Sequence, residues 1–277
     1  MSVWIYLKHF DTVNLRLRAI SAAILVPITL LAVWIGGLVY AGFAACVVIV
    51  GLYEWLRLVG PNMRARIVAI ALAMLLAIMA TGELLSPPFG AMIGVFCTLA
   101  LFFLAARDGE DRSGWVALGI PYMGGAGLAL LALRQVPDIG AALTLYLVLV
   151  VWGTDVGAFV AGRIIGGPKL APDISPSKTW AGLVGGMALA LVMGYAAAWA
   201  LGAHRPLIAA ALAPLLAVIA QLGDLFESYF KRRSGVKESG DLIPGHGGVL
   251  DRIDGLVVAA MFTALFEAAV GPQLQWW

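Results

Sequence analysis

Long apolar segments recur along almost the whole chain and constrain its fold more than any other feature. Nine can be placed: 18–36, 38–56, 65–82, 89–106, 115–133, 139–162, 180–202, 206–225 and 255–271. A helix needs about 20 apolar residues to cross about 30 Å of hydrocarbon, where only helices and closed barrels satisfy their backbone groups. The segments are continuous rather than alternating, which favours helices. We therefore predict an all-α, polytopic integral membrane protein with about nine transmembrane helices.

Lys and Arg residues are distributed unequally between the connections. All but two of the 18 lie at the amino end or in every second connection, and the alternate connections hold only Arg134 and Arg205. Cytoplasmic connections retain Lys and Arg during membrane insertion. The asymmetry predicts a cytoplasmic amino end, an odd number of helices and an external carboxyl end. Trp276 and Trp277 end the chain and suit the membrane–water interface.

The two halves of the chain differ in their polar connections. We interpret residues 1–140 as a framework of transmembrane helices. Residues 141–277 contain two longer connections on the predicted cytoplasmic side, 163–179 and 226–254, and we interpret this half as catalytic. Gly and Pro residues in the first connection prevent a continuous helix, which predicts a shaped loop.

Residues 223–254 are the most polar stretch and hold eleven of the 34 charged residues, although only 12% of the chain is charged. Asp251 and Asp254, three residues apart, share one face of the last helix. Asp224 ends the preceding helix, so two or three carboxylates meet if these helices are neighbours. Oxygen ligands of this kind suit Mg²⁺. The alternative is that the acids simply pair with nearby Lys and Arg.

The basic residues and glycines of the same stretch allow two interpretations each. Lys231, Arg232 and Lys237 could anchor the chain to anionic lipid or neutralise a polyphosphate, and the interleaved acids favour polyphosphate. The run from His246 to Gly248 could bring backbone N–H groups to phosphate oxygens. A turn with a structural histidine is an equal alternative. His246 could also donate a hydrogen bond or titrate as an acid or base.

The first connection offers hydroxyls and an ammonium group within five residues: Ser175, Ser177, Lys178 and Thr179. One of the hydroxyls is expected to cap the following helix. Asp155, inside the sixth segment, either lines a cavity or binds Arg163. Two further acids near segment ends, Glu54 and Glu267, are expected to reach water or pair locally.

These motifs resemble the signature of the phosphatidate cytidylyltransferases, also called CDP-diacylglycerol synthases. The second connection supplies Ser228, Lys231-Arg232, Lys237-Glu238, Pro244-Gly245-His246-Gly247-Gly248 and Asp251-Arg252-Ile253-Asp254. The sixth segment and the first connection together match with Asp155, Gly162-Arg163, Lys169-Leu170 and residues 175–179 in the expected order. The family usually has Asp at position 238 and often Glu at Ala181. Residues 1–140 match only as an apolar framework, which the resemblance implies also gives access to lipid.

The resemblance implies a reaction in which CTP and phosphatidic acid give CDP-diacylglycerol and diphosphate, with Mg²⁺ as cofactor, expected as two ions. It implies Asp224 and Asp251 as metal ligands and Asp254 as a third ligand or an orienting residue. Further catalytic roles fall to Lys231, Lys237 and His246. Substrate binding falls to these residues: Ser175, Ser177, Lys178, Arg232, Gly247, Gly248 and Arg252.

The expected partners are CTP, phosphatidic acid and membrane lipids, with a homodimer as a candidate assembly and no nucleic acid. The expected location is a bacterial inner membrane, with the active site on the cytoplasmic side. Two other functions remain open. An ion-coupled carrier would line a pathway with acids such as Asp155, although the polar residues gather on one face. A related transferase would use another lipid or nucleotide, such as a polyprenyl-linked acceptor.

Overall fold

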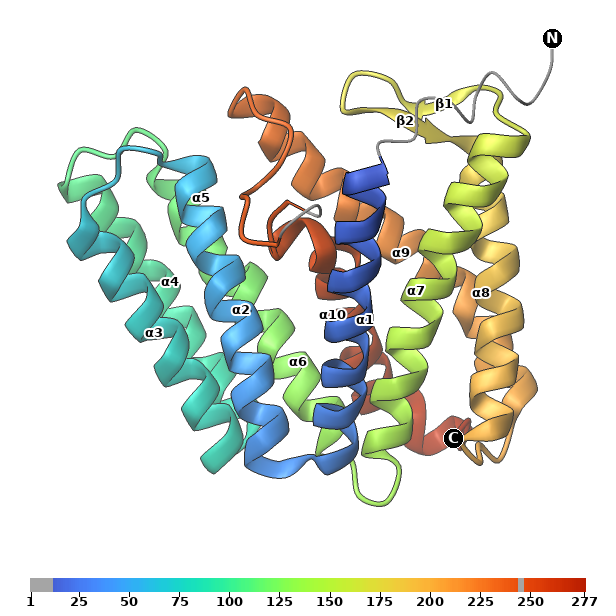
Figure 1. Ribbon diagram of the computed structural model, residues 1–277. Helices are drawn as coiled ribbons and strands as arrows, with labels where there is room; N and C mark the ends of the chain where they lie inside the picture. The colour runs from blue at the N-terminus through green and yellow to red at the C-terminus, as the bar shows by residue number, and fades with distance from the viewer. Residues whose placement is uncertain (1–11, 244–246) are drawn as a thin grey trace, which may run out of the picture.

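The computed structural model describes residues 12–243 and 247–277, and it is almost entirely helical (Figure 1). The helices are α1 (Thr12–Ile35), α2 (Gly37–Val59), α3 (Ala65–Leu84), α4 (Pro87–Arg107), α5 (Ser113–Gly119), α6 (Gly125–Arg134), α7 (Gly140–Ile164), α8 (Trp180–Ala200), α9 (Pro206–Arg233) and α10 (Leu250–Leu274). A π-helical turn, η2 (Ile120–Gly124), joins α5 to α6 in one continuous rod.

Within the described residues, eight helices are long and apolar enough to cross a membrane, with α5, η2 and α6 counted as one. Helix α1 adds a shorter apolar segment, Ile20–Ile35. The predicted all-α, polytopic membrane fold is confirmed. The side of the membrane on which each end lies stays a prediction. Three boundaries differ from the predicted ones by five residues or more: α1 begins at Thr12, α9 continues to Arg233 and α10 begins at Leu250. The apolar pattern stops where the polar residues begin, but the helical backbone continues through them.

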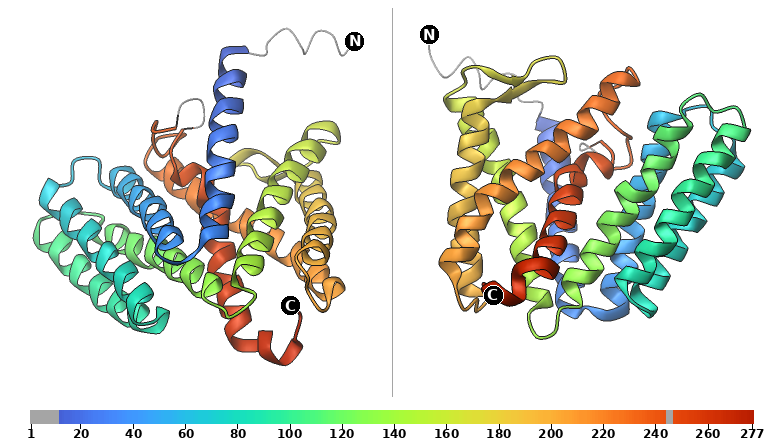
Figure 2. Two further views of the ribbon diagram at one scale, coloured as in Figure 1. Left: turned by 60° about the horizontal axis from the view of Figure 1, so that its bottom comes forward. Right: turned by 180° about the vertical axis from the view of Figure 1, so that it is seen from behind.

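The helices form two groups joined through a common centre. Figure 1 shows α2–α6 on one side and α7 and α8 on the other, with α1 and α10 between them. Helix α9 runs obliquely across the back of the bundle (Figure 2). The largest core cluster belongs to α2–α6 and also takes in Phe230 of α9 and Leu250 and Val257 of α10. Helices α9 and α10 therefore pack against both halves of the chain.

Both longer polar connections lie at one end of the bundle, the upper end in Figure 1. The first contains an antiparallel hairpin of β1 (Lys169–Ala171) and β2 (Ser175–Thr179), in which Lys169 pairs with Thr179. The predicted shaped loop is thus a hairpin. Thr179 accepts a hydrogen bond from the Gly182 backbone N–H at 3.0 Å and caps α8. One of the three hydroxyls is therefore a helix cap, as predicted.

The last two residues, both tryptophans, pack their side chains into the core. Trp276 and Trp277 are buried and pack edge-on against Tyr146, with ring centroids 5.6 and 5.3 Å away. The Trp276 indole N–H donates to Glu267 at 2.6 Å, so Glu267 pairs locally, as predicted. Both rings thus pack within the protein, and their depth relative to the membrane–water interface stays a prediction. After α10 the backbone turns at Gln275, in the left-handed region, and returns the rings to the core.

Trp55 is the central side chain of the packing between α2 and α9. It is fully buried, its ring stacks on Phe226 at 6.1 Å and it contacts Phe230 at 4.7 Å. Its indole N–H donates to the Trp115 carbonyl at 2.9 Å. Because these partners come from α5 and α9, Trp55 fixes the end of α2 beside the polar end of α9.

Replacing Trp55 with alanine should destabilise the bundle by about 3–5 kcal/mol, because removing a buried aromatic ring leaves a cavity. Trp34 is the matched control, since its side chain is 75% exposed. The measurement is the fraction of detergent-solubilised protein that stays monodisperse after heating. Trp55→Ala should lower the midpoint temperature, and Trp34→Ala should leave it near that of the unchanged chain. Equal losses in both variants would contradict the assigned packing.

Candidate active site

The polar ends of α9 and α10 meet at a crossing of two glycines. A Cβ atom on Gly223 would lie 2.6 Å from the Asp254 carbonyl oxygen, and one on Gly255 would lie 3.1 Å from the Ala220 carbonyl oxygen. Glycine allows the backbones to approach this closely. The two helix ends are thus neighbours, and Asp254 is within electrostatic range of Asp224. From the sequence, Asp224, Asp251 and Asp254 could meet only if these two helices were neighbours.

A cavity of about 460 Å³ opens beside this crossing. Its polar lining comes from α7, the hairpin and α9: Asp155, Arg163, Ser177, Lys178, Gln221 and Asp224. Its apolar lining comes from α7 and α8 and includes Phe159 and Leu183. Asp155 therefore lines a cavity, the first of the two alternatives. A lining that combines charged groups with apolar side chains suits a substrate with a charged head and an apolar body.

Lys178 ties the hairpin to α9. Its ammonium group donates to Gln221 Oε1 at 2.7 Å and lies 2.6 Å from Asp224 Oδ2. The other oxygen of Asp224 accepts from the Ser228 hydroxyl at 3.2 Å. Lys178 directly precedes the residue that caps α8, so its backbone is fixed. The Asp224 carboxylate remains 32% exposed and faces the cavity.

Lys231 is buried between two carboxylates. Its Nζ atom lies 2.5 Å from Glu227 Oε2, one turn earlier on α9, and 2.7 Å from Asp251 Oδ1 on α10. Buried charges persist when they are paired and hydrogen-bonded. Glu227 is fully buried, and its other oxygen has no partner among the described residues. The pairing of Asp251 with a basic residue, one of the sequence alternatives, is therefore present, whereas Asp224 pairs with Lys178.

Asp251 also organises the connection between α9 and α10. Its Oδ2 atom accepts from the backbone N–H groups of Ser239 at 3.0 Å and Gly248 at 2.9 Å. Both carboxylate oxygens thus have protein donors. The Gly248 N–H, considered as a phosphate ligand from the sequence, points to Asp251 in this structure. Gly247 adopts the left-handed region, with φ 79°, and its carbonyl accepts from the Ile243 N–H at 2.9 Å.

The remaining predicted residues lie around this centre. Arg232 is exposed and donates to the carbonyls of Ile174 and Val236, both at 3.1 Å, which joins the hairpin to the end of α9. Ser175 is buried, with its hydroxyl 3.5 Å from that of Ser177. Lys237 and Arg252 are exposed. Pro244, Gly245 and His246 lie outside the described residues, so the role of His246 stays a prediction.

Glu54 is a residue of this region that the sequence did not indicate. It was expected to reach water or pair locally, and this is wrong: the side chain is 4% exposed and accepts from the backbone of Leu250 at 2.7 Å. A glutamate inside an apolar run was the only available signal. Nothing in the pattern of residues showed that its partner is nearly 200 positions away.

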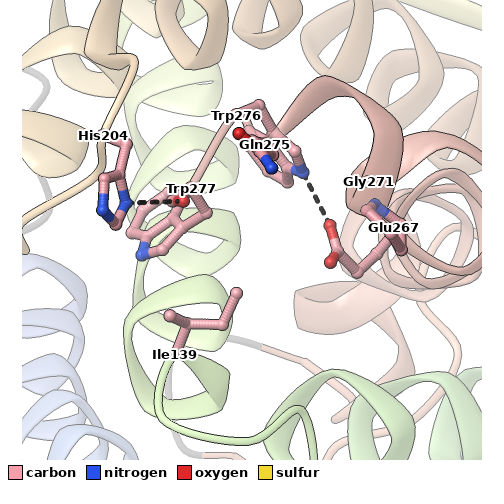
Figure 3. Close-up of a pocket in the computed structure, with 8 residues that line it drawn as sticks. Ile139, His204, Glu267, Gly271, Gln275, Trp276 and Trp277 are labelled. Atoms are coloured by element: carbon pink, nitrogen blue, oxygen red, sulfur yellow. Dashed lines mark hydrogen bonds between the residues drawn. The ribbon is translucent and has the colours of Figure 1, made fainter.

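A second cavity, of about 360 Å³, lies at the other end of the bundle, where the chain ends (Figure 3). Its polar groups are occupied by one another: His204 Nδ1 lies 3.0 Å from the Trp277 carbonyl oxygen, and Glu267 accepts from Trp276. It lacks the combination of acids and lysine that lines the first cavity. The first cavity is therefore the candidate active site.

Comparisons with known proteins cover most of the chain. The Cytidylyltransferase family matches residues 16–270. The phosphatidate cytidylyltransferase of Brucella suis biovar 1 is 40% identical over 256 residues, which is 92% of this chain and 94% of the relative. That of Pseudomonas aeruginosa is 37% identical over 267 residues, with 92% and 98% covered. The match includes the amino-terminal helices, beyond the motifs that carried the resemblance, and the chain belongs to the cytidylyltransferase family.

Proposed function

We propose that this chain is a phosphatidate cytidylyltransferase, which converts CTP and phosphatidic acid into CDP-diacylglycerol and diphosphate. The observation that carries the proposal is the cavity beside the crossing of α9 and α10, whose lining combines the Asp224–Lys178 ion pair with apolar side chains of α7 and α8. Two relatives that cover nearly the whole chain are named for this activity.

The chemistry needs alignment and charge neutralisation more than a strong base. An oxygen of the phosphatidate phosphate attacks the α-phosphorus of CTP, and the bond from this phosphorus to the bridging oxygen breaks in line. Diphosphate leaves with that oxygen. A phosphate monoester has a second pKa of about 6, so the attacking group is largely dianionic at neutral pH. The chain's own groups bind and orient the two phosphates.

The cations of the site suit this task to different degrees. Lys178 lines the cavity and can contact a phosphate while it stays next to Asp224. Ser177 lines the same cavity, and we propose that it binds phosphate as well. Arg232 and Lys237 do not line the cavity, but both are exposed in the connection after α9, and we propose that they assist phosphate binding from there. Lys231 is already held by two carboxylates, so we propose that it acts mainly by fixing Asp251.

The donor set fits Mg²⁺, which prefers oxygen ligands and neutralises charge on transferring phosphates when bound. Asp224 fits best, because its carboxylate faces the cavity. Asp155 and Asp254 lie within electrostatic range of one another, and Glu227 offers an oxygen that has no partner among the described residues. Asp251 would become a metal ligand by giving up one of the hydrogen bonds that it now accepts from Lys231, Ser239 and Gly248. Within the described residues, no three such side chains already converge in a metal-binding group. Two ions remain our proposal.

The position of the cavity suits both substrates. It lies at the end of the bundle that carries most of the basic residues, which supports a site on the cytoplasmic side of a bacterial inner membrane. Phe159 is exposed on α7 beside the cavity, so the acyl chains of a lipid could stay in the bilayer while its phosphate enters sideways. A homodimer stays a prediction.

We keep the division of the chain into a framework half and a catalytic half, with one change to the role of the framework half. The cavity and the paired carboxylates belong to residues 141–277, which supports a catalytic half. The framework half, residues 1–140, also contributes side chains to the polar end, because Glu54 bonds to the start of α10 and Trp55 packs on α9.

The activity is tested with purified protein in detergent, phosphatidic acid and Mg²⁺. CTP labelled at the α-phosphate should transfer label to the lipid phase only when phosphatidic acid and metal are present, and EDTA should stop the transfer. CTP labelled at the γ-phosphate should give no labelled lipid. Lipid label from the γ-position would indicate a kinase instead. No transfer by folded protein, with other lipid phosphates tried as acceptors, would favour the alternative transferase.

Asp224→Asn should lower kcat by roughly 100-fold or more, because the amide keeps the shape but removes the charge that holds Lys178 and a cation. The protein should remain folded in the membrane, since the Asp224 side chain is partly exposed. The matched control is Asp173→Asn, an exposed aspartate in the turn of the hairpin. The measurement is initial rate against substrate concentration. Near-normal turnover by Asp224→Asn would remove this residue from the site.

The cytoplasmic orientation predicts which connections a membrane-impermeant maleimide can reach. Asp173→Cys, in the hairpin, should react only after the cells are permeabilised. Pro137→Cys, between α6 and α7, should react in intact cells. Both positions are exposed, and Cys46 and Cys97 are first replaced with alanine. The opposite pattern would invert the proposed orientation.

A further inference from the structure

Glu54 caps a helix that it does not belong to. Its Oε1 atom accepts from the Val249 N–H at 3.0 Å and its Oε2 atom from the Leu250 N–H at 2.7 Å. These N–H groups open α10, where the first turn has no intrahelical acceptors. The positive end of a helix also favours a negative group. The Glu54 carboxylate therefore satisfies the start of α10 from α2.

Helix α10 has no cap of its own. Val249 occupies the capping position, and its side chain has no hydrogen-bond acceptor. Two glycines make room for the replacement: a Cβ on Gly240 would lie 2.8 Å from Glu54 Oε1, and one on Gly248 would lie 2.6 Å from Glu54 Oε2. The connection between α9 and α10 is thus shaped to fit around this carboxylate.

The same connection is held from the other side by Asp251. The Ser239 N–H donates to Asp251, and the Ser239 hydroxyl lies 3.4 Å from Glu54 Oε2. The Gly248 N–H donates to Asp251, and Gly248 packs against Glu54. Two buried carboxylates therefore hold the same two residues. Movement of Glu54 would shift these residues and, with them, Asp251.

Glu54 is itself rigidly supported. It precedes the fully buried Trp55, whose ring packs on α9 and whose indole N–H is bonded to the Trp115 carbonyl. Its support therefore comes from the framework half of the chain, and its hydrogen bonds go to the catalytic half.

We propose that Glu54 is a positioning residue: it fixes the start of α10 and the connection before it, and so sets the place of Asp251 in the active site. This inference rests on the proposed function for its effect on turnover. A displacement of about 1 Å in a site group can cost up to about 100-fold in rate. The substrates themselves need not contact Glu54.

Glu54→Gln is the first test variant, because it keeps the size of the side chain and replaces one acceptor oxygen with a donor. Per folded molecule, we expect kcat to fall by about 10-fold to 100-fold, with the KM values for CTP and phosphatidic acid nearly unchanged. Glu54→Asp keeps the charge with a shorter reach, so it should recover part of kcat. The matched control is Glu83→Gln on α3, where the carboxylate accepts from Gln135 at 2.8 Å.

A second measurement does not depend on activity. Lys237 is exposed in the connection, so trypsin cleavage after it reports how firmly this segment is held. Below the unfolding temperature, Glu54→Gln should be cleaved several times faster than the unchanged chain, and Glu83→Gln should not. If the unchanged chain does not label phosphatidic acid but Glu54→Gln is still cleaved faster than it, the positioning role is retained and the proposed function is rejected. Unchanged kcat and unchanged cleavage would overturn the positioning role, whatever happens to thermal stability.

Discussion

The buried ammonium group of Lys231 is the interaction on which the polar end of the bundle depends. Its partners, Glu227 and Asp251, come from α9 and α10, so the ion pair fixes the two helices to each other. A charge in this environment is tolerated only with its partners in place, and loss of one partner from such a pair typically costs about 3–5 kcal/mol. The crossing at Gly223 and Gly255 is close enough to make the pairing possible. The arrangement of the other carboxylates follows from this geometry.

The sequence predicted those features that depend on local composition. Apolar runs located the helices, and the spacing of Asp251 and Asp254 gave their shared face. A hydroxyl before α8 was correctly expected to be a cap, since capping involves residues only a few positions apart. The role of Glu54 could not be predicted, because its partners depend on how α2 and α10 pack. The burial of Trp276 was missed for the same reason: a turn after α10 decides whether the ring faces lipid or the core.

The two halves of the chain depend on each other more than their composition indicates. Residues 1–140 contain few charges apart from their connections, which favours the interpretation of a passive framework. Yet the end of α2 supplies both an aromatic anchor for α9 and an acceptor for the backbone of α10. The bilayer explains why such contacts are specific: without water, each backbone N–H must find a protein partner. The N–H groups of Val249 and Leu250 therefore bond to a buried carboxylate close to them, that of Glu54.

The charge balance of the site bears on how an anionic substrate can enter it. Five carboxylates gather near the crossing: Asp155, Asp224, Glu227, Asp251 and Asp254. Lys178 is already paired with Asp224, and Lys231 is paired with both Glu227 and Asp251. Arg163 lines the cavity and Arg252 lies within electrostatic range of Asp155, but with every carboxylate ionised the five acids still outnumber these four cations and would repel a triphosphate and a lipid phosphate. Divalent cations that enter with the nucleotide would offset this repulsion, which is the physical argument for our proposal that CTP binds together with Mg²⁺.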